Sequence, residues 1–192
     1  RSVVVRRKGD GSIEDCIPAG FSARTRVHEY GGGSYLVADG ILCFVNFSDQ
    51  RLYRAAPGAA PEPITPAGPF QYADLAWDGA RRRILCVRED HSAGGEPSNA
   101  LVAIRADGSA PPTPLAAGRD FYAAPRLSPD GRWLTFLAWD HPSMPWDAAE
   151  VWLAPLREDG ASGEARRIAG GRGESAIQPL WSPDGVLHFV SD

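Results

Sequence analysis

The residues that could carry out acid–base or nucleophilic chemistry in this sequence include four histidines: His28, His91, His141 and His188. A serine nucleophile on a strand-to-helix turn requires the pattern Gly-x-Ser-x-Gly. The nearest match, around Ser34 at residues 32–36, lacks the second glycine and leads into a predicted strand. No histidine lies beside a convincing serine and acid pair. The sequence therefore predicts no catalytic residue within this chain.

Metal and cofactor sites have equally little support. There is no Cys-x-x-Cys pair and no His-x-x-x-His spacing. Asp140 and His141 together with Asp147 could ligate a metal by chance, but a hydrogen-bonded loop explains them better. The glycines at 31–33 precede no helix, so close backbone packing explains them better than phosphate binding. We expect no metal and no cofactor.

Polar and aromatic residues gather in three segments, at 24–33, 90–99 and 140–147. If these segments are loops of the repeated sheets described below, they emerge on one face. Such a face suits a ligand or another domain. It would collect Arg26, His28, Glu29, Tyr30, Asp90, His91, Glu96, Asp140, His141, Trp146 and Asp147, with Trp139 at its edge.

Two of these predictions have a competing structural interpretation. Glu29 could hold the amino terminus of a peptide or pair with an arginine of another domain. A carboxylate that bonds the backbone amides of its own glycine-rich loop is the favoured alternative. Trp139 and Trp146 could form an aromatic wall, or the proline-rich segment 142–145 could fold back and bury both rings.

A repeat determines the elements that must position these residues. Ser-Pro-Asp-Gly at 128–131 returns at 182–185, with weaker copies at 76–79 and 37–40. Each Asp-Gly pair joins two apolar runs, as in a hairpin. A third and a fourth run follow, which gives four strands in units of about 50 residues and indicates a β-propeller. No segment predicts a helix.

The copies of the repeat give an all-β fold, a β-propeller fragment with three complete four-stranded blades. The flanking half blades fall at 2–6 with 13–17, and at the last two runs up to Val190. Residues 1–192 would then be about half a ring, an excerpt of a longer chain. Strands at open sheet edges favour pairing, so two copies could associate edge to edge.

Composition excludes several partners. The net charge of −4 and the absence of a basic cluster argue against nucleic acid. No apolar run approaches the roughly 20 residues that cross a bilayer, and no secretion signal is visible. Cys43 and Cys86 fall within apolar runs, where cysteine acts as a small buried hydrophobe. We therefore expect a reduced, cytoplasmic setting.

Three features together resemble one known family: the Ser-Pro-Asp-Gly blades, the segment 28–35 (HEYGGGSY) and the segment 138–147 (AWDHPSMPWD). They are similar to the propeller of prolyl-oligopeptidase-family serine peptidases, especially bacterial acylaminoacyl and dipeptidyl peptidases. The resemblance implies a C-terminal α/β-hydrolase domain that carries the catalytic triad and is absent from this chain. It also implies that the propeller limits entry to short peptides. The alternative is a non-enzymatic TolB-like propeller that scaffolds protein partners, because Ser-Pro-Asp-Gly occurs there too.

Overall fold

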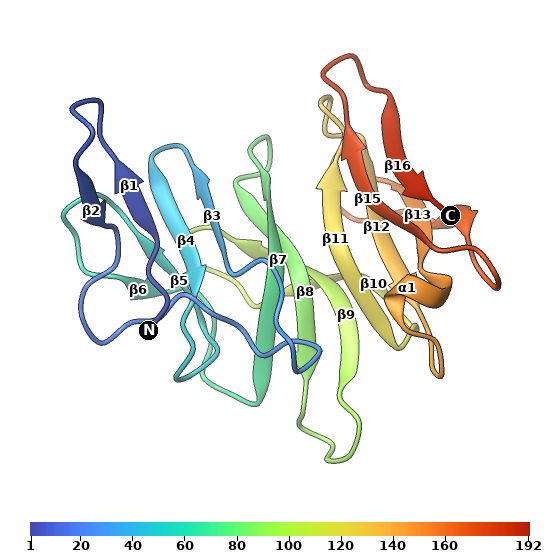
Figure 1. The fold of residues 1–192 in the computed structure, drawn as a ribbon, viewed down its shortest axis with the longest axis horizontal. Coiled ribbons are helices and arrows are strands. Elements are labelled where there is room, and N and C mark those ends of the chain that lie inside the picture. The colour runs from blue at the N-terminus through green and yellow to red at the C-terminus, as the bar shows by residue number, and fades with distance from the viewer.

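The computed structural model describes all 192 residues, and they form five antiparallel sheets that follow one another along the chain (Figure 1). A two-stranded sheet comes first, and another comes last. Three four-stranded sheets, here called the first, second and third blade, lie between them. The strands are β1 (Val5–Arg7) and β2 (Ile13–Asp15); β3 (Tyr35–Ala38), β4 (Ile41–Val45), β5 (Leu52–Ala55) and β6 (Glu62–Pro63) of the first blade; β7 (Phe70–Asp78), β8 (Arg83–Asp90), β9 (Ser98–Arg105) and β10 (Thr113–Ala117) of the second; β11 (Phe121–Leu127), β12 (Trp133–Trp139), β13 (Glu150–Pro155) and β14 (Arg166–Gly170) of the third; and β15 (Ala176–Trp181) and β16 (Leu187–Ser191).

The predicted fold class and blade count are confirmed. Within each blade every strand pairs with the next in sequence, so each blade is a simple meander. Apolar side chains fill the space between adjacent blades. Leu85 and Leu101 of the second blade, for example, pack in one cluster with Leu134 and Phe136 of the third. Each blade therefore buries its faces against its neighbours, as expected for stacked repeats.

The Ser-Pro-Asp-Gly repeat forms the turn between the first two strands of a blade. In the third blade the Ser128 hydroxyl donates to the Asp130 carboxylate at 2.6 Å and accepts the Trp133 backbone N–H at 2.9 Å. Gly131 has φ +67°, in the left-handed region that glycine adopts most easily. Ser182 and Asp184 form the same contact in the last sheet. The motif recurs because each hairpin needs the same local hydrogen bonds.

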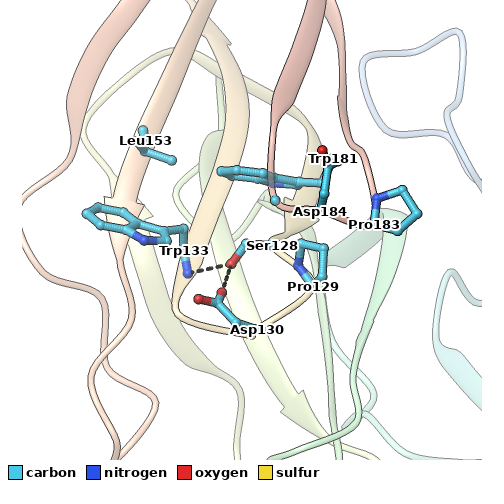
Figure 2. A pocket seen from close by; sticks show the side chains of 9 residues that line it. Ser128, Pro129, Asp130, Trp133, Leu153, Trp181, Pro183 and Asp184 are labelled. Carbon is cyan, nitrogen blue, oxygen red and sulfur yellow. Dashed lines mark hydrogen bonds between the residues drawn. The ribbon is translucent and has the colours of Figure 1, made fainter.

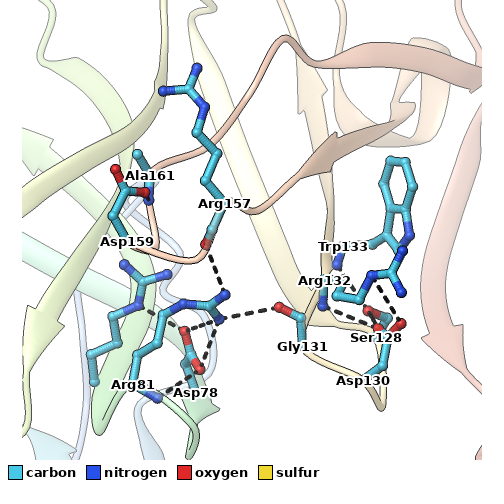
Figure 3. A network of polar contacts seen from close by, with 11 residues as sticks. Asp78, Arg81, Ser128, Asp130, Gly131, Arg132, Trp133, Arg157, Asp159 and Ala161 are labelled. Atoms are coloured by element: carbon cyan, nitrogen blue, oxygen red, sulfur yellow. Dashed lines mark hydrogen bonds and ion pairs between the residues drawn. The ribbon is translucent and has the colours of Figure 1, made fainter.

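Polar contacts tie the turn of the second blade to the third (Figure 3). Asp78 is 2% exposed and pairs with Arg83 at 2.8 Å and with Arg81 at 3.2 Å. Arg81 also donates to the backbone carbonyls of Gly131 at 3.2 Å and Arg157 at 2.9 Å. A buried carboxylate that is fully paired in this way holds two adjacent blades in register.

A second tie lies among the first strands of successive blades, which contact one another side by side. The ladder of β7 is interrupted between Ala73 and Ala76, and Asp74 there has φ +56°. Its carboxylate accepts the Gly33 backbone N–H at 2.7 Å and the Ala124 backbone N–H at 2.9 Å. Asp74 thus joins all three blades. A Cβ at Gly31 would lie 3.1 Å from the Thr25 carbonyl oxygen, and one at Gly33 would lie 3.4 Å from the Asp74 Cα, which confirms the prediction of close backbone packing at this glycine run.

One element was not predicted: the single-turn helix α1 (Pro145–Ala148). Pro145 starts the helix, and the Asp147 carboxylate accepts the Met144 backbone N–H at 3.0 Å. A helix this short forms through its proline and cap and has no apolar period to detect. No helix in the structure has the length and apolar character that a membrane crossing requires.

Candidate functional site

The three predicted loop segments surround one cavity of about 1000 Å³. Its lining comes from the loops at the strand ends opposite the Asp-Gly turns and includes Met144 and Pro145 at the start of α1, an element labelled in Figure 1. Eight of the twelve residues predicted for this face line it. They are Arg26, His28, Glu29, Tyr30, His91, Glu96, Trp139 and His141.

Aromatic rings form one wall of the cavity. Phe121 and Trp139 stack with their centroids 5.3 Å apart, and the His28 ring meets both at 5.4 Å. His141 lies 4.8 Å from Phe121, and Tyr30 lies 5.6 Å from His28. Five rings drawn from two loops and two strands thus offer an apolar surface.

The two tryptophans differ. Trp139 is 3% exposed and packs with Leu137 and Val151 in a buried cluster while it also lines the cavity. Trp146 is 65% exposed. The expectation that residues 142–145 bury both rings is therefore wrong for Trp146, because α1 starts at Pro145 and buries none of its residues.

The segment that carries His28 and Glu29 has an unusual backbone. Both residues have φ in the left-handed region, +56° and +64°. Local turn bonds run from the Glu29 N–H to the Arg26 carbonyl and from the Gly31 N–H to the Val27 carbonyl, each at 2.8 Å. The Glu89 carboxylate of β8 accepts the His28 backbone N–H at 2.7 Å. The second blade, which contains β8, therefore fixes this segment.

The Glu29 side chain is exposed, lines the cavity, and has no hydrogen bond or ion pair within the chain. The carboxylates that bond the amides of this loop belong to Glu89 and Asp74 instead. The favoured interpretation, in which the Glu29 carboxylate bonds the backbone amides of its own glycine-rich loop, is therefore wrong. Its carboxylate stays free to accept hydrogen bonds from another molecule.

Four predicted residues do not line the cavity: Asp90, Asp140, Trp146 and Asp147. Asp90 accepts the Ser92 backbone N–H at 2.9 Å. Asp140 accepts the Asp120 N–H at 2.9 Å and pairs with Arg119, and Asp147 caps α1. Each carboxylate bonds groups of its own or an adjacent loop, as short acids at turns commonly do.

Glu89, Gln71 and Phe121 line the cavity without having been predicted. All three lie within strands, where side chains are assigned to packing by default. Glu89 is the one with a signal in the sequence, because it alternates with Leu85 and Val87 on one face of β8, and a buried carboxylate requires a partner.

The electrostatics of the cavity favour a cation. Three carboxylates, Glu29, Glu89 and Glu96, face one guanidinium, that of Arg26. Burial lowers the pKa of His28 below its usual value, against the opposing effect of Glu89 and Asp74, so the ring is neutral at pH 7. Burial likewise raises the pKa of Tyr30. A cationic amine with an adjacent apolar group matches this arrangement.

Two buried polar atoms at the cavity have no hydrogen-bond partner in the chain: the His28 Nε2 and the Gln71 Oε1. Buried polar atoms are nearly always paired, so these two are available to a bound molecule. No group of three or more His, Cys, Asp or Glu side chains comes together as a metal site requires.

A second cleft, of about 510 Å³, lies on the opposite face between the two Ser-Pro-Asp-Gly turns (Figure 2). Trp133, Trp181 and Leu153 line it, and the Ser128 hydroxyl faces the Asp130 carboxylate within its own turn. Ser128 and Asp130 thus stabilise their own hairpin turn. The cavity on the loop face is the better candidate site.

Comparison with known proteins identifies the family. No protein-family model matches the sequence, and no curated protein matches it. Among solved structures, puromycin hydrolase shares 36% identity over 99% of this chain with a TM-score of 0.92. A puromycin-hydrolyzing peptidase of Mycobacterium tuberculosis shares 38% identity over 98% of the chain with a TM-score of 0.85. The chain belongs to the propeller of the prolyl-oligopeptidase family.

The chain spans 32% of puromycin hydrolase and 33% of the mycobacterial peptidase. This chain also resembles TolB of Acinetobacter baumannii, with 16% identity and a TM-score of 0.55. That likeness extends to the fold alone. The predicted family resemblance is thus confirmed, whereas the TolB-like alternative rests on fold similarity only.

Proposed function

We propose that this chain forms the part of a peptidase propeller that receives one end of a short peptide and restricts access to the catalytic centre. The serine, acid and histidine would belong to a C-terminal α/β-hydrolase domain outside these 192 residues. One observation carries the proposal: the unpaired Glu29 carboxylate beside the aromatic wall. The similarity to two puromycin-hydrolyzing enzymes supports a peptidase.

The cavity residues would divide the binding between two kinds of contact. Glu29, with Glu96 nearby, would accept hydrogen bonds from a protonated amine at the end of the peptide. Phe121, Trp139 and Tyr30 would hold an adjacent apolar side chain. Binding both parts fixes the peptide in one orientation, which is what a propeller can contribute to a reaction carried out by another domain.

Substitution of Glu29 by Gln in the full-length enzyme tests this proposal. The KM for a peptide with a free amino terminus should rise about tenfold with kcat nearly unchanged, because a contact made equally to substrate and transition state is lost. An N-acetylated peptide should show no change. The control is Glu164→Gln, another exposed carboxylate without a partner, which does not line the cavity. An unchanged kcat/KM in a stable Glu29→Gln enzyme would rule out the binding role.

Four expectations accompany the proposal. A Gly-x-Ser-x-Gly elbow should be encoded beyond Asp192, and the 192-residue chain alone should show no peptide turnover. The cytoplasmic location stays a prediction, and so does edge-to-edge pairing between copies. A non-enzymatic scaffold would instead require that no hydrolase domain accompany the propeller.

A further inference from the structure

We infer that Glu89 is a positioning residue that holds His28 and Glu29 against the substrate cavity. The inference rests on the proposed function, since it concerns how the proposed amine-binding carboxylate is kept in place. Glu89 lies near the end of β8 and faces the cavity. It bonds a segment of the chain 61 residues away, which lies between β2 and β3 in the sequence.

The surroundings of Glu89 are unusual for a carboxylate. It is 3% exposed, and no lysine or arginine pairs with it. Its two contacts are the His28 backbone N–H at 2.7 Å and the His91 Nε2 at 3.2 Å. Burying a carboxylate costs free energy unless hydrogen bonds replace water, and an apolar residue would avoid that cost at this core position. Its contacts therefore explain why an acid occupies the position.

The segment bonded by Glu89 needs an anchor. Left-handed φ angles at two successive non-glycine residues, His28 and Glu29, persist only where the surroundings enforce them. The other backbone bonds at residues 29 and 31 are local and close within four residues. Outside contacts also hold the two ends of the loop, where the Gln50 side chain accepts the Arg26 N–H at 2.9 Å and Asp74 accepts the Gly33 N–H at 2.7 Å. Glu89 supplies the outside bond at the left-handed pair itself, through the His28 N–H. Without it, the Glu29 carboxylate would no longer keep a fixed place beside the rings.

The same contact sets the His28 ring. His28 meets the edges of both Phe121 and Trp139, and its Nε2 is buried without a partner. Gln71, which lies opposite Glu89 in the β7–β8 register, presents the second unpartnered atom, Oε1. Glu89 is thus a direct neighbour of both residues whose buried polar atoms have no partner in the chain. Displacing it would disturb both the polar and the charged contacts of the cavity.

Kinetics of the full-length enzyme test this role. Glu89→Ala should raise the KM for a free-amine peptide about tenfold and change kcat less than about twofold. Glu89→Gln keeps an oxygen that accepts the His28 N–H and should recover most of the loss. If Glu89 acts through Glu29, adding Glu89→Ala to Glu29→Gln should raise KM no further. The matched control is Asp78→Ala, which removes another buried carboxylate on the opposite face and should lower Tm without raising KM.

A second measurement tests the anchor apart from activity. In the 192-residue chain, hydrogen exchange at the His28 amide should be slow and should become at least about tenfold faster in Glu89→Ala but not in Asp78→Ala. An active enzyme in which Glu89→Ala keeps the wild-type KM, or in which its effect adds fully to that of Glu29→Gln, would overturn the inference. Unchanged exchange at His28 would also overturn it. A full-length wild type without peptidase activity would instead refute the proposed function, while the exchange result still decides whether Glu89 anchors the segment.

Discussion

Asp74 should be the most sensitive single position for the stability of this propeller. Its carboxylate is the shared acceptor for two backbone N–H groups, Gly33 of the first blade at 2.7 Å and Ala124 of the third at 2.9 Å. Asp74→Ala leaves both amides without this acceptor at a junction of three blades. Asp74→Asn keeps one acceptor oxygen but turns an NH2 group toward the second amide.

The expected loss follows from the number of bonds. A hydrogen bond to a charged group contributes about 1.5–3 kcal/mol, and Asp74 is only half-buried, so the two bonds together should be worth about 2–4 kcal/mol. For a chain of this size each kcal/mol lowers Tm by about 2–4 °C. Asp74→Ala should therefore lower Tm by roughly 5–15 °C, and Asp74→Asn by about half as much.

Thermal unfolding followed by circular dichroism measures the effect directly. The control is Asp107→Ala, whose carboxylate accepts the Ser109 N–H at 3.0 Å within its own exposed turn. This substitution should cost less than about 1 kcal/mol. If Asp74→Ala and Asp107→Ala lower Tm equally, the bonds of Asp74 between blades do not stabilise the fold and the reasoning fails.

Two further predictions concern titratable groups. Because burial lowers the pKa of His28 in the folded chain, the unfolded chain binds more protons below about pH 6.5, so the free energy of unfolding should decrease as pH falls through that value. His28→Asn, which tolerates the left-handed φ, should remove this part of the decrease in urea denaturation between pH 8 and pH 5; parallel profiles for both proteins would contradict it. Burial raises the pKa of the Cys43 thiol to about 11 and also raises that of Cys86. At pH 8 a thiol reagent should therefore label half-buried Cys16 quickly, and Cys43 and Cys86 only on unfolding; rapid labelling of all three cysteines would show that the blades open readily.

The fold could be predicted because each repeat contains its own turn chemistry. Ser128, Asp130 and Gly131 stabilise their hairpin through contacts within six residues. The motif therefore predicts each pair of strands independently of the neighbouring blades. The helix α1 could not be predicted in this way. Its stability comes from Pro145 and the Asp147 cap, and a helix of four residues leaves no periodic signal.

The site could be predicted in part. The connection order of a propeller brings the loops around His28, His91 and His141 to one face, so their convergence follows from the repeat. The strand residues that complete the cavity, Glu89 and Phe121, were missed because their importance depends on contacts with a distant segment. An acid that alternates with apolar residues along a strand is the signal that could have found both Glu89 and Asp74.

Other residues were predicted for the site but lie outside the cavity. Asp90 and Asp147 look suited to binding, yet each bonds a backbone N–H within three residues. A short carboxylate at the start of a turn reaches its own backbone, and its most common role is to close that turn. Glu29 also lies in a turn, one rich in glycine, but its side chain is longer by one methylene than that of aspartate. The amides that it would otherwise bond already have partners on other strands.

This difference indicates why the candidate site lies on the loop face. On the turn face, the Ser128 and Asp130 side chains bond within their hairpin, and Asp78 is paired by two arginines. On the loop face, Glu89 and Asp74 bond the backbone from neighbouring strands, and this leaves Glu29, His28 and Gln71 with unused donors or acceptors. Polar groups with unused bonding capacity beside an apolar wall are what recognition of another molecule requires. Anchoring the loop from adjacent blades, rather than through its own side chains, is therefore what frees those side chains for binding.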